Sequence, residues 1–166
     1  MPKKTSVIVF ERIALIGIGL IGSSIARRIK RDGLANHISV SARSQKSLDK
    51  AIELEFADTA TLNQQECVKN ADLIIICSPV GAYSNIIQNI KSDLKSGAIV
   101  TDVGSVKQAV IRDLEPHIPE GVHLVPAHPV AGTERSGPEA GFPELFDERW
   151  CIITPTTQTN KDHLIK

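Results

Sequence analysis

The sequence predicts an α/β domain with a doubly wound, mainly parallel β-sheet, and three observations lead to this fold class. Short apolar runs alternate along the chain with segments whose apolar residues recur at helical spacing. The run at 73–76 is apolar without interruption, which is typical of a central parallel strand buried on both faces. The run at 12–16 leads into a Gly-x-Gly-x-x-Gly pattern at 17–22, and a helical pattern begins inside it.

The elements can be assigned in chain order. A helix follows the strand at 12–16, and its apolar residues Ile21, Ile25 and Ile29 recur every fourth position. Gly33 is placed to end this helix, because glycine adopts the left-handed cap conformation at little cost. The later elements are strand 38–42, a helix marked by Leu48, Ile52 and Phe56, a weak strand at 57–60, strand 72–77, a helix through Ile86, Ile87 and Ile90 that ends near Gly97, strand 98–103, a helix marked by Val106, Val110 and Leu114, and short strands at 123–127 and 150–154.

The end of the chain does not complete another stable element. Residues 159–166 begin like a capped helix but provide barely two turns, which is too short to be stable alone. We therefore expect residues 1–155 to form one domain and residues 156–166 to begin a connection to a second domain that this chain lacks.

The composition excludes several classes of function. The chain has 166 residues, enough for a domain with a core, and its 19 basic residues balance 19 acidic ones. This balance argues against a nucleic-acid or anionic-membrane partner, and no apolar run is long enough to span a membrane. The apolar stretch at 7–10 is too short for a secretory signal. Three widely spaced cysteines, Cys67, Cys77 and Cys151, predict reduced thiols in a cytoplasmic protein.

Polar or glycine-rich segments follow several of the expected strands directly. Because ligands of open α/β sheets bind outside the carboxyl ends of the strands, these segments predict a single cleft. The segments are 17–22, 41–44, 78–81, 102–105 and 127–129.

The glycine pattern predicts a Rossmann-type dinucleotide-binding site. Gly17 permits a tight turn, Gly19 leaves room for a phosphate beside the backbone, and Gly22 lets the helix pack closely on the strand. The helix N-terminus, at Leu20 and Ile21, offers free N–H groups to an anion. Further cofactor contacts are expected from the ends of the later strands, at Ser78, Pro79, Val80 and Gly104.

The end of the second strand predicts NADP in preference to NAD, although NAD stays possible. An NAD site usually has a carboxylate near this position to bind the ribose hydroxyls, and the sequence has Ala42 there instead. Arg43 and Ser44 follow, and arginine can bind a 2′-phosphate through its planar fork. The alternative is that Arg43 is a solvated loop cation that stacks on adenine.

Two residues near the strand ends are candidates for chemistry. Ser105 can cap the next helix, with Gln108 completing a capping box, or it can present its hydroxyl to the cleft, and the two roles are compatible. His128 ends an apolar strand, is held extended by Pro129, and opens the glycine-containing loop 128–137. A histidine there can accept a proton near neutral pH, and the alternative is a surface or capping role.

Other polar residues have simpler interpretations on spacing alone. Glu134 and Arg135 would be solvated loop charges, and no Cys/His spacing suggests a metal site. The remaining histidines are expected at the surface: His37, His117, His123 and His163.

Four motifs, taken together, resemble one known family. They are Ile16-Gly17-Ile18-Gly19-Leu20-Ile21-Gly22-Ser23-Ser24, Cys77-Ser78-Pro79-Val80, Thr101-Asp102-Val103-Gly104-Ser105-Val106-Lys107, and His128-Pro129-Val130-Ala131-Gly132-Thr133-Glu134-Arg135-Ser136-Gly137. They resemble the nicotinamide-binding domain of the prephenate dehydrogenase family, which includes arogenate and cyclohexadienyl dehydrogenases. The resemblance covers about residues 11–155, and the last two motifs are its most specific part.

The resemblance implies oxidative decarboxylation of prephenate and/or arogenate on the route to tyrosine. By analogy, His128 accepts the proton of the substrate hydroxyl while hydride passes to the nicotinamide, and Ser105 orients the same hydroxyl. Both residues would then contact the substrate, together with Thr133 and Glu134. The family also has a helical C-terminal domain that completes the substrate pocket and forms a homodimer, and this chain lacks it.

Two other functions stay open at this point. One is a different small-molecule dehydrogenase, acting on hydroxy acids or imines, against which the loop at 128–137 argues. The other is a non-catalytic nucleotide-binding fragment without a substrate domain.

Overall fold

The computed structural model describes residues 8–157 and 159, and it confirms the doubly wound sheet. Six parallel strands form the main sheet in the order β3-β2-β1-β4-β5-β6. The chain therefore extends the sheet from β1 in one direction, through β2 and β3, and then in the other direction from β4. The strands are β1 (Phe10–Ile16), β2 (Ala35–Ser41), β3 (Thr59–Thr61), β4 (Leu73–Ile76), β5 (Ile99–Asp102) and β6 (His123–Leu124).

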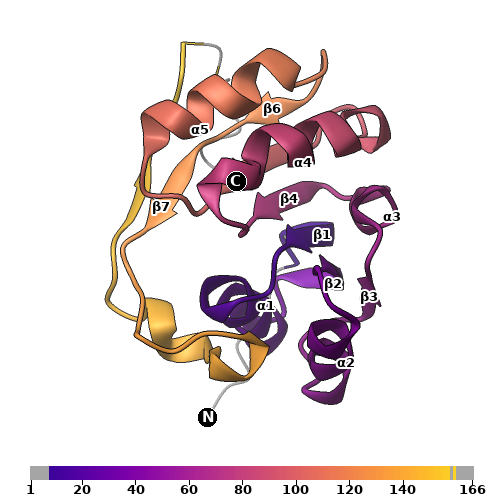
Figure 1. Cartoon of the computed structure of the whole chain (residues 1–166), viewed down its shortest axis with the longest axis vertical. Coiled ribbons are helices and arrows are strands. Elements are labelled where there is room, and N and C mark those ends of the chain that lie inside the picture. The colour runs from indigo at the N-terminus through magenta and orange to yellow at the C-terminus, as the bar shows by residue number, and fades with distance from the viewer. Residues whose placement is uncertain (1–7, 158, 160–166) are drawn as a thin grey trace.

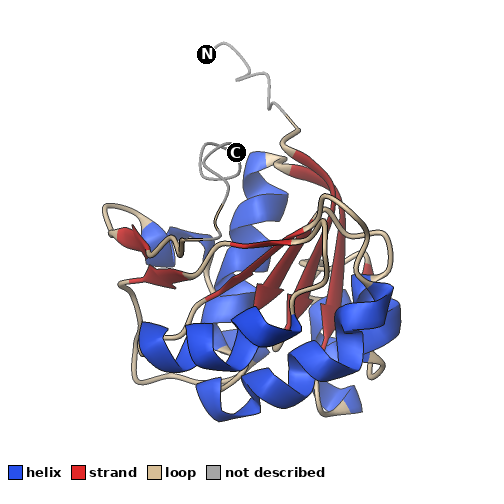
Figure 2. Ribbon diagram, turned by 90° about the horizontal axis from the view of Figure 1, so that it is seen from above, coloured by secondary structure: helices blue, strands red, loops and turns tan. Residues whose placement is uncertain are grey.

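Helices cover both faces of this sheet (Figures 1 and 2). The helices α1 and α2 lie on one face, and α4 and α5 lie on the other (Figure 1). The α-helices are α1 (Leu20–Asp32), α2 (Gln45–Glu53), α3 (Gln64–Val68), α4 (Tyr83–Ile90) and α5 (Lys107–Leu114). Short 3₁₀ turns are η1 (Val80–Ala82), η2 (Lys91–Asp93), η3 (Glu115–His117), η4 (Pro138–Ala140) and η5 (Pro143–Phe146). Among the described residues, none of the helices has the length and apolar character needed to cross a membrane.

The core has two parts because successive side chains of a strand point to opposite faces. In β1, Ile13 and Leu15 pack in the cluster under α1 and α2, whereas Ala14 and Ile16 pack in the cluster under α3, α4 and α5. The middle strand β4 divides in the same way, so its uninterrupted apolar sequence is explained by burial on both faces.

The prediction for α1 is confirmed at its end and only partly along its length. Gly33 adopts the left-handed conformation, with φ of 63°, and its N–H is bonded to Ile29 O and Lys30 O. Ile29 is buried, but Ile21 and Ile25 are half-buried.

The prediction for the second helix is too long, because it includes Phe56. The helix α2 ends at Glu53, and Glu55 adopts a left-handed conformation with φ of 55°. This reversal returns Phe56 to the core from outside the helix, where it is 1% exposed. The buried face of α2 is formed by Leu48 and Ala51, so Ile52 points away from it and is 48% exposed.

Two other boundaries differ from the prediction, and one helix was not predicted. The helix α5 begins at Lys107, after Val106, which is 58% exposed, so Val110 and Leu114 alone supply the expected apolar face. The helix α4 ends at Ile90, seven residues before Gly97. The five-residue helix α3 was not predicted, although Asn63 caps it by accepting bonds from Gln65 N and Glu66 N at 2.9 and 3.2 Å.

The strand expected at 123–127 is two strands in different sheets. Val125 N donates to Val100 O, but Ala127 N, the next donor that faces β5, bonds to the side chain of Asp102 instead of a backbone carbonyl, and the pairing ends there. The chain then turns into β7 (Ala127–Pro129), which pairs in an antiparallel ribbon with β8 (Cys151–Ile153). The strand predicted at 150–154 thus exists, but it lies outside the main sheet.

Residues 130–150, which we call the strap, leave β7, cross to α1 and return to β8 (Figure 1). Their attachment to α1 is polar. Phe142 N donates to Ser24 Oγ at 3.1 Å, Arg28 is paired with Asp147, and Arg31 Nη1 lies 3.0 Å from Glu144 Oε1. The strap is therefore fixed in its second half, beside the helix that follows the glycine turn.

The last residues are described only in part. Thr159 Oγ1 donates to Leu124 O at 3.1 Å, which attaches this part of the chain to β6. The helix expected over 159–166 lies outside the described residues, apart from Thr159.

Asp72 ties together the amino-terminal edge of the sheet. Its carboxylate accepts a bond from Arg12 N at 2.8 Å and one from Lys95 Nζ. Burial raises the pKa of Asp72, but the bonds from Lys95 and Arg12 outweigh it, and the net pKa is lowered. A carboxylate whose pKa is lowered by folding stabilises the protein above its unfolded pKa, and this contribution is lost as the pH falls.

We therefore expect Asp72→Asn to reduce the free energy of unfolding at pH 7 by about 1.5–3 kcal/mol, the range for hydrogen bonds to charged groups. The variant should also be less sensitive to acid than the wild type. In the wild type the stabilising contribution of the Asp72 carboxylate is lost below about pH 4, the ordinary pKa of Asp, and the variant lacks this contribution at every pH. Urea unfolding between pH 3 and 7 measures both effects. The exposed Glu120 supplies the control Glu120→Gln, and equal curves for the two variants would contradict this role of Asp72.

Candidate functional site

The carboxyl ends of four neighbouring strands lie level with one another. Ile16 at the end of β1 is in register with Ser41 of β2 and with Ile76 of β4, and Ile76 is in register with Asp102 of β5. The expected convergence is thereby confirmed for four of the five segments, whereas the fifth, 127–129, lies in the separate ribbon of β7 and β8. A cavity of about 790 Å³ opens at this edge, lined by Ile16, Gly17, Ile18, Gly19, Ser41, Ala42, Arg43, Ser44, Ser47, Gln64, Cys77, Ser78, Pro79, Ser136, Gly137 and Pro138.

The three glycines of the turn have three different environments. Gly17 has φ of 96°, which a side chain disfavours, and its N–H donates to Ser41 O at 2.9 Å. A Cβ on Gly22 would lie 2.2 Å from Gly17 O, so α1 can pack this closely on β1 only with glycine there. A Cβ on Gly19 would meet no atom within 4 Å, so the space beside this backbone is open.

These environments fit a dinucleotide phosphate. Gly19 is the N-cap of α1 and makes no side-chain capping bond, so the first N–H groups of the helix keep their donors for a ligand. An anion at this position is favoured by those donors and by the positive end of the helix dipole. The open space at Gly19 is the approach that a phosphate requires.

The structure brings some of the predicted cofactor residues into this cavity and places others beside it. Gly17, Gly19, Arg43, Ser44, Ser78 and Pro79 line it. The residues that do not line it are Leu20, Ile21, Gly22, Val80 and Gly104. The last two adjoin each other, since a Cβ on Gly104 would lie 2.7 Å from Val80 Cγ2.

At the end of β2 the cavity is lined by one cationic side chain and by serine hydroxyls. Ser44 caps α2, accepting a bond from Ser47 N at 3.3 Å, and the two serine hydroxyl oxygens are 2.9 Å apart. The exposed Arg43 precedes them at the mouth. None of the described residues that line the cavity is Asp or Glu.

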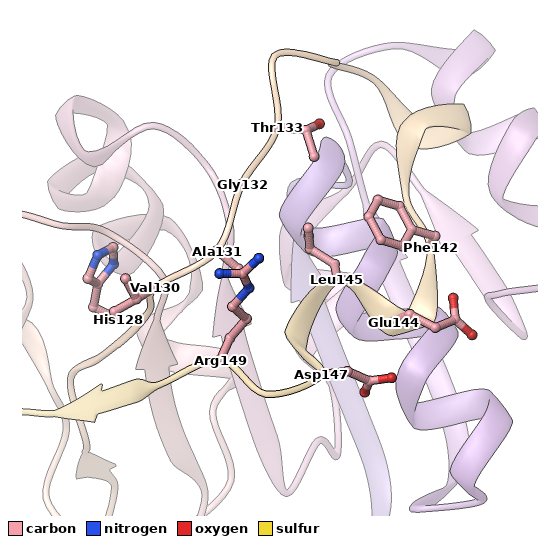
Figure 3. A pocket seen from close by; sticks show the side chains of 10 residues that line it. All are labelled: His128, Val130, Ala131, Gly132, Thr133, Phe142, Glu144, Leu145, Asp147 and Arg149. Atoms are coloured by element: carbon pink, nitrogen blue, oxygen red, sulfur yellow. The ribbon is translucent and has the colours of Figure 1, made fainter.

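A second cavity, of about 560 Å³, lies between β7 and the strap. Figure 3 shows His128, Val130 and Arg149 at one end of it, and Phe142, Glu144 and Asp147 at the other. Of the two further residues predicted to contact substrate, Thr133 lines this cavity, whereas Glu134 is exposed on the strap and lines neither cavity.

His128 is half-buried at the start of this cavity. Its Nδ1 lies 3.3 Å from Val103 O. Because a carbonyl oxygen can only accept, Nδ1 carries the proton in this contact, and Nε2 keeps its lone pair in the neutral ring. The arrangement therefore supplies a nitrogen that can accept a proton.

The capping interpretation of Ser105 is wrong. The N-cap of α5 is Val106, and no side chain makes the capping bond. Ser105 is exposed in the turn between β5 and α5 and lines neither cavity. The turn is instead held from inside by Asp102, which accepts a bond from Gly104 N at 2.8 Å.

Asp102 and Lys107 form a buried ion pair that the sequence interpretation did not assign. Lys107 Nζ lies 2.7 and 2.6 Å from the two carboxylate oxygens of Asp102, and it donates to Ala127 O at 2.5 Å. Asp102 Oδ1 also accepts a bond from Ala127 N at 3.2 Å. An aspartate that ends an apolar strand, followed five residues later by a lysine, was the available signal.

The side chains of Tyr83, Cys67 and Cys77 are neutral groups. Tyr83 donates to Ile76 O at 3.1 Å, and burial raises the pKa of this tyrosine. Burial also raises the pKa of Cys67 to about 11 and raises the pKa of Cys77. These two cysteines therefore do not supply thiolates at neutral pH.

The other histidines within the described part of the chain line neither cavity. His37, His117 and His123 are half-buried rather than fully at the surface, and His37 Nε2 lies 3.1 Å from Thr59 Oγ1. His163 lies outside the described residues.

The parallel sheet reverses its strand order between β1 and β4, and the glycine turn and the open helix N-terminus lie at that point. These features define a Rossmann-type dinucleotide-binding domain. Residues 25–166 match the sequence model of a protein family, the nucleotide-binding domain of prephenate dehydrogenase. The chain belongs to this family.

Relatives and solved structures agree with this assignment. The chain is 42% identical over 151 residues to the cyclohexadienyl dehydrogenase of Zymomonas mobilis, covering 91% of this chain and 51% of that protein. It is 32% identical to the prephenate dehydrogenase of Bacillus subtilis, covering 91% of this chain and 41% of that protein. The chain thus spans about half the length, or less, of these curated relatives.

Two crystal structures share the fold over nearly the whole chain. Prephenate dehydrogenase from Aquifex aeolicus, in complex with hydroxyphenyl propionate and NAD+, has a TM-score of 0.85 and 31% identity, with 98% of this chain and 56% of that chain covered. Synechocystis arogenate dehydrogenase has a TM-score of 0.81 and 26% identity, with 93% and 53% covered.

The glycine environments predict opposite effects of two matched substitutions. Gly19→Ala should leave the melting temperature unchanged, because its Cβ meets no protein atom, and should weaken dinucleotide binding about tenfold or more, because it fills the space of a phosphate. Gly22→Ala should lower the melting temperature, since its Cβ would collide with Gly17 O. Thermal unfolding and titration calorimetry with NAD+ and NADP+ measure both effects, and unchanged affinity in Gly19→Ala would contradict the phosphate assignment.

Proposed function

We propose that this chain is the cofactor-binding part of a dehydrogenase that oxidatively decarboxylates prephenate and/or arogenate in tyrosine biosynthesis. Membership of the family supports a dehydrogenase role, and the names of the relatives support these substrates. The observation that carries the proposal is the position of His128. Its ring is held on Val103 O, next to the end of β5, so a proton acceptor lies at the sheet edge that also bears the glycine turn.

The reaction needs a proton acceptor and correct placement more than covalent catalysis by the protein. The substrate ring carries a hydroxyl on the carbon that loses hydride and a carboxylate that leaves as carbon dioxide. When bound, the nicotinamide accepts the hydride with its electron pair. His128 Nε2 accepts the hydroxyl proton as the carbonyl forms, and the C–C electrons released by decarboxylation complete the aromatic ring, whose carbonyl oxygen then takes up a proton.

His128 can perform this role because of its tautomer. Donation from Nδ1 to Val103 O leaves Nε2 as the acceptor, and the same bond stabilises the imidazolium that forms after proton transfer. Thr133, in the same cavity, can bind a polar substituent of the ring. Ser105 and Glu134 remain proposed substrate contacts, and both are exposed.

We further propose that the cofactor is NADP in preference to NAD. The cavity end at Arg43, Ser44 and Ser47 offers a guanidinium and two hydroxyls, and its described lining has no carboxylate to repel a 2′-phosphate. NAD binding stays possible because the phosphate site at Gly19 is common to both cofactors.

The complete enzyme is proposed to be larger than this chain. Because the chain spans about half the length of its relatives, we propose that a helical C-terminal domain completes the substrate pocket and forms a homodimer. Residues 1–155 would then be the dinucleotide-binding domain. The three free cysteines support a cytoplasmic location.

His128→Asn should lower kcat at least about 100-fold, which is typical for the loss of a general base. The dissociation constant of the cofactor should change less than about twofold, because His128 does not line the dinucleotide cavity. Stopped-flow absorbance of the reduced nicotinamide in the full-length gene product measures the first effect, and calorimetry measures the second. A kcat close to the wild-type value would sink the assignment.

Cofactor choice and substrate are tested together by crossing prephenate and arogenate with NAD+ and NADP+ in the full-length gene product. We expect kcat/KM for NADP+ to exceed that for NAD+ by about tenfold or more, since a charge-assisted bond contributes about 1.5–3 kcal/mol. The double variant Ala42→Asp with Arg43→Asn should reverse this preference. Turnover of other hydroxy acids alone would favour a different dehydrogenase, and cofactor binding without any turnover would favour a non-catalytic nucleotide-binding protein.

A further inference from the structure

We propose that the buried pair Asp102–Lys107 positions His128, by clamping the residue before it onto the end of β5. The pair itself contacts neither substrate nor cofactor in this proposal, so both are positioning residues. The inference rests on the proposed function, because His128 is positioned for that reaction.

The burial of the pair indicates a role other than simple stabilisation. The side chain of Asp102 is 0% exposed and that of Lys107 is 14% exposed, so both charges are largely removed from water. Desolvation offsets much of the attraction within such a pair, and apolar side chains of similar volume often stabilise a protein as well. A pair of this kind is best explained by the specific geometry that it imposes.

That geometry is imposed on Ala127, the residue immediately before His128. Its N–H donates to Asp102 Oδ1 at 3.2 Å, and its carbonyl oxygen accepts from Lys107 Nζ at 2.5 Å. Both backbone groups of one residue are thus held by the two members of the pair. This clamp is made where the chain leaves the main sheet, just after β6 has ended.

The clamp also sets the orientation of the imidazole. Because Ala127 is fixed on Asp102, the residues that follow them, His128 and Val103, come into contact. His128 Nδ1 lies 3.3 Å from Val103 O. On the other side, Asp102 Oδ2 accepts from Gly104 N at 2.8 Å and so shapes the turn toward Ser105. One carboxylate therefore determines the positions of both segments that carry the proposed catalytic residues.

The opposite edge of the sheet offers a matched control. Lys95 pairs there with Asp72, which also accepts a backbone N–H bond, from Arg12 N at 2.8 Å. The side chains of Lys95 and Asp72 are 40% and 26% exposed. This pair has the same chemistry at the same sheet but lies at the amino ends of the strands, away from His128.

The first test compares Lys107→Met with Lys95→Met by the side-chain ¹H–¹⁵N spectrum of the histidines in this chain, at pH 8.5, where imidazoles are mostly neutral. In the wild type, the signal of His128 should show a proton on Nδ1, and His128→Asn identifies that signal. Lys107→Met should shift the signal or mix the two tautomers, because the ring loses its fixed contact with Val103 O. Lys95→Met should leave the signal unchanged.

The second test measures kinetics in the full-length gene product. Lys107→Met should lower kcat about 10- to 100-fold, as expected when a reacting group is displaced by about 1 Å, with KM for the cofactor changed less than about threefold. Lys95→Met should leave kcat within about twofold. An equal fall of kcat in both variants would mean that the pair acts only through stability and would overturn the proposal.

Lys107→Met leaves the carboxylate of Asp102 buried without its partner and can prevent folding, so a second variant removes both charges. Asp102→Asn with Lys107→Met contains no unpaired charge, but it still lacks the bond from Lys107 Nζ to Ala127 O. It should show the same altered His128 signal and the same fall in kcat. A wild-type spectrum and a wild-type kcat in this double variant would refute the clamp. Because the spectrum needs no substrate, it decides the role of the pair even if the full-length protein turns over neither prephenate nor arogenate.

Discussion

The contact between Gly22 and the carbonyl of Gly17 is the constraint on which the rest of the structure depends. A Cβ at residue 22 would lie 2.2 Å from that oxygen, so only glycine lets α1 begin this close to the end of β1. The close start of α1 brings its N-terminus to the edge where the four strands end. It also places Ser24, Arg28 and Arg31 where they bind the strap, so the helix that begins at the first cavity also holds the wall of the second cavity.

The sheet and the glycine turn could be predicted because their signals are local and repeated. An uninterrupted apolar strand such as 73–76 requires burial on both faces, and parallel strands must end at one edge. Helix and strand boundaries were less predictable, because a single residue can reverse the chain. Glu55 returns Phe56 to the core from outside α2, and the bond from Ala127 N to the side chain of Asp102 ends one strand where a second begins.

Within the site, the sequence could indicate which residues end the strands but not which of them meet. His128 and Thr133 line one cavity, and Arg43 and Ser44 line the other. The role of Ser105 as a cap was wrong because the interior carboxylate of Asp102 holds that turn. Ala127 meets Asp102 and Lys107 across 25 and 20 residues of sequence, and no local pattern reports such a contact.

The strap is one continuous segment that contributes to both cavities. Val130 to Thr133 line the cavity of His128, and Ser136 to Pro138 line the cavity of the glycine turn, with only two residues between these groups. A ligand of one cavity that displaces the strap residues of both cavities would alter the affinity of the other cavity, and thermodynamic reciprocity would make the two effects equal in free energy. The covalent continuity of the strap thus gives the two ligands a route by which each can strengthen or weaken the binding of the other.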